Sequence, residues 1–181
     1  LKLDMPGFNA NMPSGKFEAF KDMIFDIVEE GHKVLVFSQF VQMLQQIRNW
    51  LEMADIPFCY LDGSSKDRLE QVDRFNNTPS IRIFLISLKA GGTGLNLTSA
   101  DYVIHYDPWW NPAVESQATD RAHRIGQSRQ VFSYKLICQN TVEEKILKLQ
   151  EMKRGVAEAV IPGQDSWKSL TREDLEMLFE V

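Results

Sequence analysis

Arg121 and Arg124 are the residues of this sequence whose type and spacing best suit chemistry on a phosphate group. With Gln117 and Asp120 they fall on one face of a predicted helix, because residues three and four apart are neighbours on a helix surface. Guanidinium groups so placed can neutralise the charge that develops on a transferred phosphoryl group. A solvated helix face with an Asp120–Arg124 ion pair has the same spacing, so both interpretations stay open at this point.

A glycine-rich segment, residues 87–97, directly follows a predicted strand. Its three glycines and one threonine leave backbone N–H groups exposed, which suits close approach to a phosphate. A tight turn from strand to helix needs the same residues, so the segment alone does not decide between the two. A dinucleotide site is disfavoured, because the spacing is not G-x-G-x-x-G and the segment does not follow the first strand.

Two adjacent tryptophans, Trp109 and Trp110, lie between prolines in the segment DPWWNP, residues 107–112. Neighbouring side chains of this size point in different directions, so at least one is hard to bury completely. The pair is suited either to a wedge in a domain interface or to a loop that rests on a nucleic-acid backbone.

The elements that must position these residues alternate between helix and strand. Apolar spacing predicts helices over residues 15–30, 41–54, 69–75 and 112–125, and strands over residues 34–37, 57–61, 82–87, 102–106 and 131–137. Alternation with short connections is typical of an open parallel sheet with helices on both faces. Ligands of such sheets bind at the carboxyl ends of the strands, where residues 38–40, 87–94 and 107–112 fall.

The pattern changes at both ends of the chain. Residues 1–13 read as an extended lead-in without periodicity, and the first residue is Leu1, so we expect a fragment of a longer protein. After Thr141, a helical stripe from Val142 to Val156 and a second short amphipathic segment over 170–181 predict a helical appendage. We expect this appendage, residues 141–181, to brace against something outside the sheet.

Composition excludes several classes of protein. Of 181 residues, 44% are hydrophobic and 25% are charged, as in globular proteins, and no apolar run reaches the roughly 20 residues that span a bilayer. Two isolated cysteines and three histidines lack metal-ligand spacing, so no metal site and an intracellular location are predicted. The net charge is −5, yet residues 82–135 carry six basic against four acidic side chains. A local positive face on an acidic protein is compatible with phosphate binding at one site.

The motifs together resemble those of Swi/Snf-type ATPases, a branch of helicase superfamily two. Residues 87–112 and 117–127 are similar to motifs V and VI, residues 34–40 to motif IV, and residues 61–77 to the segment after it. The resemblance covers residues 14–155, and the combination of DPWWNP with DRAHRIGQ is very specific. It implies a linker over residues 1–13 and a second RecA-like lobe over residues 14–140, with residues 141–181 as the brace.

The resemblance also implies a role for each candidate residue. Arg121 and Arg124 would face the triphosphate, with Arg124 as the arginine finger. Four further residues would lie on the nucleotide side: Gly94, Gln117, Asp120 and Gln127. Eight residues are candidates for the DNA side: Ser38, Lys89, Ala90, Gly91, Gly92, Thr93, Trp109 and Trp110.

The implied activity is ATP-driven translocation on double-stranded DNA without strand separation, which remodels DNA-bound proteins. ATP and Mg²⁺ would be bound mainly by an N-terminal RecA-like lobe, because this chain has no P-loop and no acidic pair for the metal. The segment 14–17 lacks the earlier glycine of a P-loop, and the segment 29–32 ends a helix rather than a strand. The isolated chain is therefore expected to be inactive.

Two other functions remain as alternatives: a metabolic enzyme that uses a nucleotide or dinucleotide, and an interaction domain that has lost the motor. The compact form favours a prokaryotic protein of the cytoplasm or nucleoid. A eukaryotic member would be nuclear.

Overall fold

A computed structural model describes residues 14–91, 94–123, 130–159, 171 and 174 of the 181 residues. In this part of the chain a single sheet has the strand order β2-β3-β1-β4-β5, and all of its neighbours pair in parallel. Its strands are β1 (Val34–Ser38), β2 (Phe58–Leu61), β3 (Ile83–Ser87), β4 (Tyr102–His105) and β5 (Phe132–Lys135). The predicted open parallel α/β fold is confirmed.

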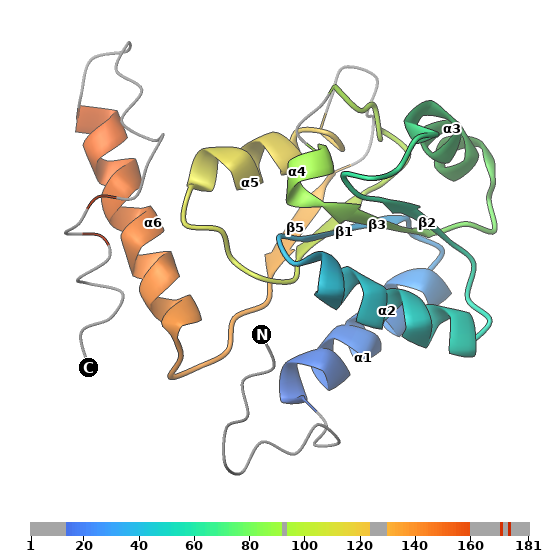
Figure 1. Ribbon diagram of the computed structural model, residues 1–181, viewed down its shortest axis with the longest axis horizontal. Helices are drawn as coiled ribbons and strands as arrows, with labels where there is room; N and C mark the ends of the chain where they lie inside the picture. The colour runs from blue at the N-terminus through green and yellow to red at the C-terminus, as the bar shows by residue number, and fades with distance from the viewer. Residues whose placement is uncertain (1–13, 92–93, 124–129, 160–170, 172–173, 175–181) are drawn as a thin grey trace.

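Helices cover both faces of the sheet (Figure 1). One face packs against α1 (Gly15–Glu29) and α2 (Val41–Met53), and the other against α3 (Arg68–Asn77), α4 (Leu88–Gly91) and α5 (Pro112–Thr119). The central strands β1 and β3 are buried along their whole length, because parallel strands are covered on both sides. Side chains of β1 alternate between the two cores: Val34 and Val36 face α1 and α2, whereas Leu35 and Phe37 belong to the opposite core.

The first helix ends where the sequence predicts. Gly31 has a φ of +87°, a left-handed conformation that favours glycine after a helix. A Cβ atom at Gly31 would meet Nη1 of Arg82 at 3.2 Å, and this guanidinium donates a 2.7 Å hydrogen bond to the Val28 carbonyl. The acidic residues before Gly31 therefore belong to a helix terminus and not to a helicase acidic box.

The helix that carries the arginine motif is shorter than predicted. We expected it to reach residue 125, but α5 ends at Thr119, and residues 120–123 form turns. Within these turns Arg121 N donates to Ala118 O at 3.2 Å, a bond across three residues, not four. The Arg121 carbonyl accepts a 3.1 Å hydrogen bond from Leu97 N, which belongs to the glycine-rich segment. Of Gln117, Asp120 and Arg121, only Gln117 lies within α5, and the other two follow its end.

The last described helix is α6 (Val142–Ala159), which stands beside the β5 end of the sheet (Figure 1). Its predicted apolar stripe is only partly buried: Leu149 is 2% exposed, whereas Val142 is 49% and Met152 is 60% exposed. None of the described helices is long and apolar enough to cross a membrane. The linker over residues 1–13 and all but two residues of the predicted segment 170–181 lie outside the described residues.

Candidate functional site

The carboxyl ends of the central strands meet at Ser38 and Asp107. The Ser38 hydroxyl donates to Oδ1 of Asp107, and Gln39 N donates to Oδ2 at 2.9 Å. Burial raises the pKa of Asp107 above its usual range, against these two hydrogen bonds, which lower it. Ser38 was a candidate for DNA contact, but its side chain is fully buried. In this structure its hydroxyl orients Asp107 and does not reach the surface.

The glycine-rich segment begins with the short helix α4, which the sequence did not predict. Lys89 is exposed on this helix, whereas the side chain of Ala90 is buried. The Ala90 amide, predicted to contact a phosphate, donates to Oγ of Ser87 at 3.3 Å. Lys89 is therefore the residue of this pair that faces solvent, while Gly92 and Thr93 lie outside the described residues.

Gly94 follows in a left-handed conformation with a φ of +50°. Among the described residues, no heavy atom beyond the adjacent residues lies within 4 Å of the position that a Cβ would occupy, so the backbone conformation of Gly94 favours glycine. Gly94 is exposed to solvent. Leu97 then leads the segment back to the arginine turn through its hydrogen bond to Arg121.

The DPWWNP segment starts helix α5. Asn111 caps the helix, because its Oδ1 accepts a 3.0 Å hydrogen bond from Ala113 N, and Pro112 takes the first turn, where no amide partner is needed. The two indoles are half-buried and tilted at 43°, with ring centroids 5.8 Å apart. Asn111 and Pro112 thus start the helix directly after the two tryptophans.

Buried polar side chains hold the backbone of Trp109 from two helices. On α5, Glu115 is 2% exposed, accepts from Trp109 N at 2.7 Å and pairs with Lys135 of β5. On α6, Gln150 is also 2% exposed, donates to the Trp109 carbonyl and accepts from Lys135 Nζ at 2.9 Å. We call Trp109, Glu115, Lys135 and Gln150 the tryptophan network. It fixes the tryptophan segment relative to both α5 and α6.

Two further contacts attach α6 to the same part of the molecule. Lys153 Nζ lies 5.3 Å from the Trp110 ring centroid, a cation–π contact. At the start of α6, Glu143 pairs with Lys16 of α1 at 2.7 Å and accepts from Cys138 N at the same distance. Lys16, which stands in the rejected P-loop match, is thus bound by a carboxylate of the appendage.

The predicted nucleotide-side residues differ in exposure. Arg121 is 5% exposed, whereas Gln117 and Asp120 are exposed on the surface of the α5 segment. The structure brings Arg121 to the end of the glycine-rich segment through the Leu97 hydrogen bond. Arg124 and Gln127 lie outside the described residues.

A buried histidine lies directly behind this surface. His105 is 1% exposed, stacks on Phe37 at 5.6 Å and contacts Oγ1 of Thr119 through Nε2 at 3.1 Å. Its Nδ1 has no hydrogen-bond partner in the described part of the chain. Burial lowers the pKa of His105 to about 4, so the ring is neutral at pH 7. It lines a polar cavity of about 220 Å³ together with Glu115 and Lys135.

No group of His, Cys, Asp and Glu residues within the described ranges could hold a metal ion. A family model described as the helicase conserved C-terminal domain matches residues 15–126. The chain belongs to this family.

Relatives of this helicase C-terminal domain include bacterial and fungal proteins. This chain is 41% identical over 170 residues to an uncharacterized ATP-dependent helicase of Mycoplasma pneumoniae, and the alignment covers 92% of this chain and 16% of that protein. This chain is 46% identical over 152 residues to the chromatin-remodeling ATPase INO80 of Gibberella zeae, and the alignment covers 83% of this chain and 8% of that protein. The compact form of the domain therefore does not separate prokaryotic from eukaryotic members.

Solved structures agree with these relatives. The C-terminal part of the Fun30 ATPase domain superposes with a TM-score of 0.78 at 38% identity, covering 94% of this chain and 54% of that one. The Sulfolobus solfataricus SWI2/SNF2 ATPase core in complex with dsDNA superposes with a TM-score of 0.70 at 39% identity, covering 93% of this chain and 36% of that chain. The resemblance to Swi/Snf-type ATPases and the RecA-like fold are confirmed.

Sequence patterns missed the residues that join the motifs of the helicase C-terminal domain. Glu115, Lys135 and Gln150 come from three elements and meet only in the folded chain. His105 could have been found, because alternation along the predicted strand 102–106 places it on the same face as Val103 and away from solvent.

Proposed function

We propose that this chain is the C-terminal motor lobe of a DNA-stimulated ATPase that translocates on double-stranded DNA and remodels protein–DNA complexes. The chain spans between 8% and 16% of the length of the curated relatives it matches, so the activity belongs to a larger protein. One observation carries the proposal: the Leu97–Arg121 hydrogen bond of 3.1 Å joins the glycine-rich segment to the arginine turn. A DNA-side segment and a nucleotide-side segment are thereby linked through the backbone.

ATP with Mg²⁺ supplies the phosphoryl group and is held mainly by an N-terminal lobe. This chain contributes cations: Arg121 and Arg124 face the triphosphate when the two lobes close, with Arg124 as the finger. Such fingers contribute about 10³–10⁵ in rate by neutralising charge on the transferred group. Gly94, Gln117, Asp120 and Gln127 form the remaining nucleotide-side surface, and the exposure of Gly94, Gln117 and Asp120 supports this role.

On the DNA side, Lys89 and the backbone of residues 91–93 track the phosphates of one strand. The exposed ammonium group of Lys89 supports this assignment, because phosphate contacts by Lys and Arg dominate affinity for duplex DNA. Trp109 and Trp110 support the loop that lies beside them. Each closure of the lobes shifts this grip relative to the other lobe, which moves the duplex by a step without separating its strands.

The appendage, residues 141–181, acts as a brace, and residues 1–13 as the link to the N-terminal lobe. The exposed apolar side chains of Val142 and Met152 support a brace, because they leave α6 with apolar surface for the other lobe while Gln150 attaches it to this one. The remodelled target is a DNA-bound protein, and the site of action is inside the cell, where DNA lies.

The decisive experiment is Arg124→Ala in the full two-lobe protein. We expect DNA-stimulated ATPase activity to fall by about 10³-fold or more while duplex affinity stays unchanged, because the finger acts on the nucleotide and not on DNA. Arg48→Ala is the matched control, since Arg48 is exposed on α2 and lies in none of the motifs. ATPase activity of the Arg124 variant near the wild-type rate would overturn the central claim.

A further inference from the structure

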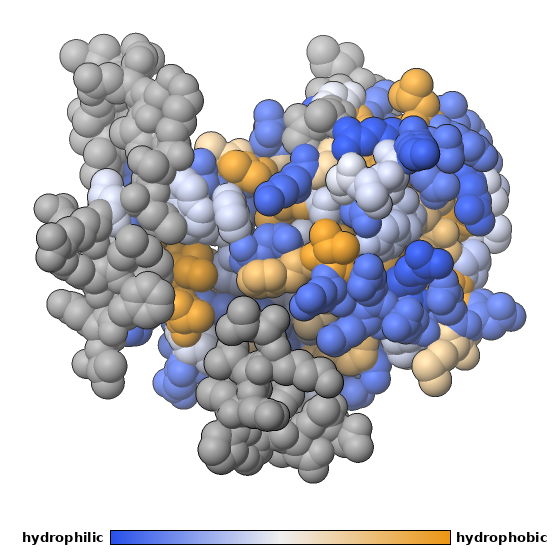
Figure 2. All heavy atoms as spheres, viewed as in Figure 1, coloured by the Kyte–Doolittle hydropathy of each residue, from blue (hydrophilic) through white to orange (hydrophobic). Residues whose placement is uncertain are grey.

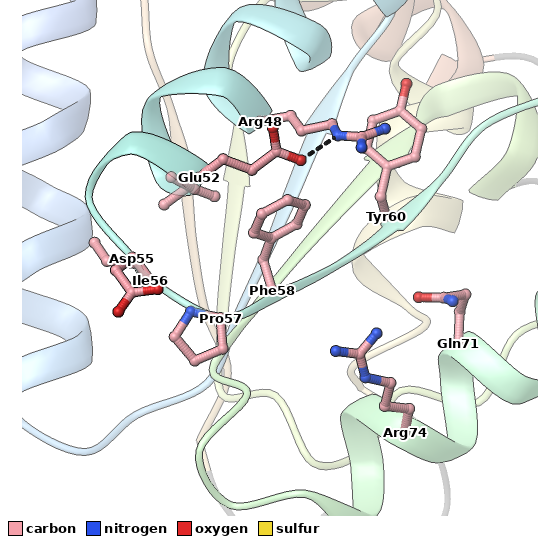
Figure 3. A pocket seen from close by; sticks show the side chains of 10 residues that line it. Arg48, Glu52, Asp55, Ile56, Pro57, Phe58, Tyr60, Gln71 and Arg74 are labelled. Carbon is pink, nitrogen blue, oxygen red and sulfur yellow. Dashed lines mark hydrogen bonds and ion pairs between the residues drawn. The ribbon is translucent and has the colours of Figure 1, made fainter.

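A groove of about 660 Å³ opens at the β2 end of the sheet, and none of the candidate site residues lines it. It starts at the amino end of β2, away from the carboxyl edge that holds Asp107 and Lys89. Figure 3 shows its walls, which come from α2, from the β2 strand itself and from α3. Its lining includes Arg48, Glu52, Asp55, Phe58, Tyr60 and Arg74, with Gln71 beside Arg74.

The floor of the groove is the open edge of the sheet. β2 is the outermost strand and pairs only with β3, so alternate residues direct backbone N–H and C=O groups outward. Within the described residues, no backbone group outside the sheet bonds to this outer edge of β2. An extended segment can satisfy such an edge by adding a strand.

The two walls of the groove have different chemistry. Phe58 and Tyr60 point toward α2, where Arg48 is held by Glu52 at 2.8 Å and lies 5.7 Å from the Tyr60 ring centroid (Figure 3). The charge of Arg48 is therefore already balanced, and this wall is aromatic. On the opposite side Arg74 is exposed on α3 and has no carboxylate partner in the described part of the chain.

We propose that this groove takes an extended segment of a protein partner as an added strand, with apolar side chains against Phe58 and Tyr60 and acidic side chains toward Arg74. Side chains of a strand alternate between two faces, so the recognised sequence alternates apolar and acidic residues. The unbalanced charge of Arg74 selects the acidic ones. Glu52 and Asp55 disfavour a continuous polyanion, because their carboxylates lie at the same groove.

The surroundings of the groove fit a segment and not a large apolar partner. On the face shown in Figure 2, α2 and α3 carry mostly hydrophilic side chains with isolated hydrophobic ones. The groove also lies at the other end of the sheet from β5 and the tryptophan network. A partner held here leaves the carboxyl edge accessible, so it can stay bound while that edge is occupied.

The binding test uses a fluorescent peptide of about eight residues, the length of a common strand, that alternates Asp and Val. Its affinity for the protein is measured by fluorescence anisotropy beside a peptide of the same composition with all Val before all Asp. We expect the alternating peptide to bind at least about tenfold more tightly, because only it matches both walls. Equal affinity of the two peptides overturns the proposal.

Reversing the charge of Arg74 tests whether the α3 wall of the groove recognises the acidic side chains of the peptide. Arg74→Glu should weaken binding of the Asp-Val peptide by about tenfold or more, and a Lys-Val peptide should restore it. Lys148→Glu is the matched control, because Lys148 is exposed on α6 and undergoes the same change of charge. Thermal melting monitored by circular dichroism confirms that both variants are folded. Unchanged peptide affinity with a weakened affinity for duplex DNA would assign the groove to nucleic acid and overturn the proposal.

Methylating the backbone of the peptide tests whether it pairs with the outer edge of β2. N-methyl groups on every second amide of the peptide block the hydrogen bonds to β2 in one phase and point away from it in the other. We expect one methylated peptide to lose binding and the other to retain it. The same affinity for both methylated peptides contradicts strand addition.

Discussion

At the β5 end of the sheet, buried polar side chains join three elements to the tryptophan segment, whereas at the β2 end the polar side chains lie in water. Glu115 and Gln150 are each 2% exposed, while the Arg48–Glu52 pair of α2 is about half exposed on both sides. A buried polar group that loses its partner keeps its desolvation cost, but an exposed one is solvated again. The β5 end should therefore be far more sensitive to substitution than the β2 end.

The largest expected effect is that of Glu115→Ala. Removing this carboxylate leaves the Trp109 amide without its partner and leaves the Lys135 ammonium with its hydrogen bond to Gln150 in place of the ion pair. Breaking a buried pair costs about 3–5 kcal/mol, and because Lys135 is 26% exposed we expect the lower end of this range, about 3 kcal/mol. The free energy of unfolding from a urea titration measures the loss. Glu52→Ala is the control at the β2 end and should cost less than about 0.5 kcal/mol, because its partner Arg48 stays in water. Equal losses would contradict the difference between the two ends.

A smaller effect at the β5 end depends on pH through His105. Its pKa is about 4 in the folded chain and 6.5 ordinarily, so between these values the unfolded chain binds a proton that the folded chain does not. The contribution of the neutral ring is complete above pH 6.5 and is lost as the pH falls toward 4. The loss amounts to at most about 3 kcal/mol.

The change is measured by comparing urea unfolding of the wild type and His105→Gln from pH 7 to pH 4. The glutamine keeps a polar group near Thr119 but does not titrate, so the pH dependence of the variant should be shallower by one proton. Parallel curves for the two proteins would show that His105 titrates normally and that the β5 end is open to water.

The smallest of these effects is that of Gln150→Ala on α6. The Trp109 carbonyl and Lys135 each lose one hydrogen bond, at a cost of about 1–3 kcal/mol. Because Gln150 touches the peptide of Trp109, the tryptophan emission should also shift. Gln46→Ala, an exposed glutamine of α2, should leave both unfolding and emission unchanged. An emission spectrum unaltered by Gln150→Ala would mean that α6 does not hold the tryptophan segment.

The sheet and its helices were predictable because each depends on the spacing of neighbouring residues. The runs Val34 to Phe37 and Ile83 to Ser87 indicate buried strands without any knowledge of their partners. The contact of Arg121 with the glycine-rich segment was not predictable, because the Leu97 amide that meets the Arg121 carbonyl comes from another part of the sequence. For the same reason the sequence could not show that the Ser38 hydroxyl and the Ala90 amide turn inward.

The candidate site also contains parts that the sequence predicts and parts that it does not. Motif order identified the glycine-rich segment, the tryptophans and the arginines, and the comparisons confirm the family that these motifs indicate. Periodicity along α6 singled out Val142 and Met152, which are exposed, and passed over Gln150, which is buried. A polar residue inside a helical stripe has no local pattern to mark it, because its partners belong to other elements. The roles of individual residues in phosphate and DNA binding stay predictions.

The Leu97–Arg121 bond has a consequence for sequence divergence. Both of its atoms belong to the main chain, so substitution of either side chain leaves the donor and the acceptor in place. At position 97 only proline lacks the donor. The bond itself therefore sets no requirement on either side chain, and a proline at position 97 is the substitution that would separate the two segments.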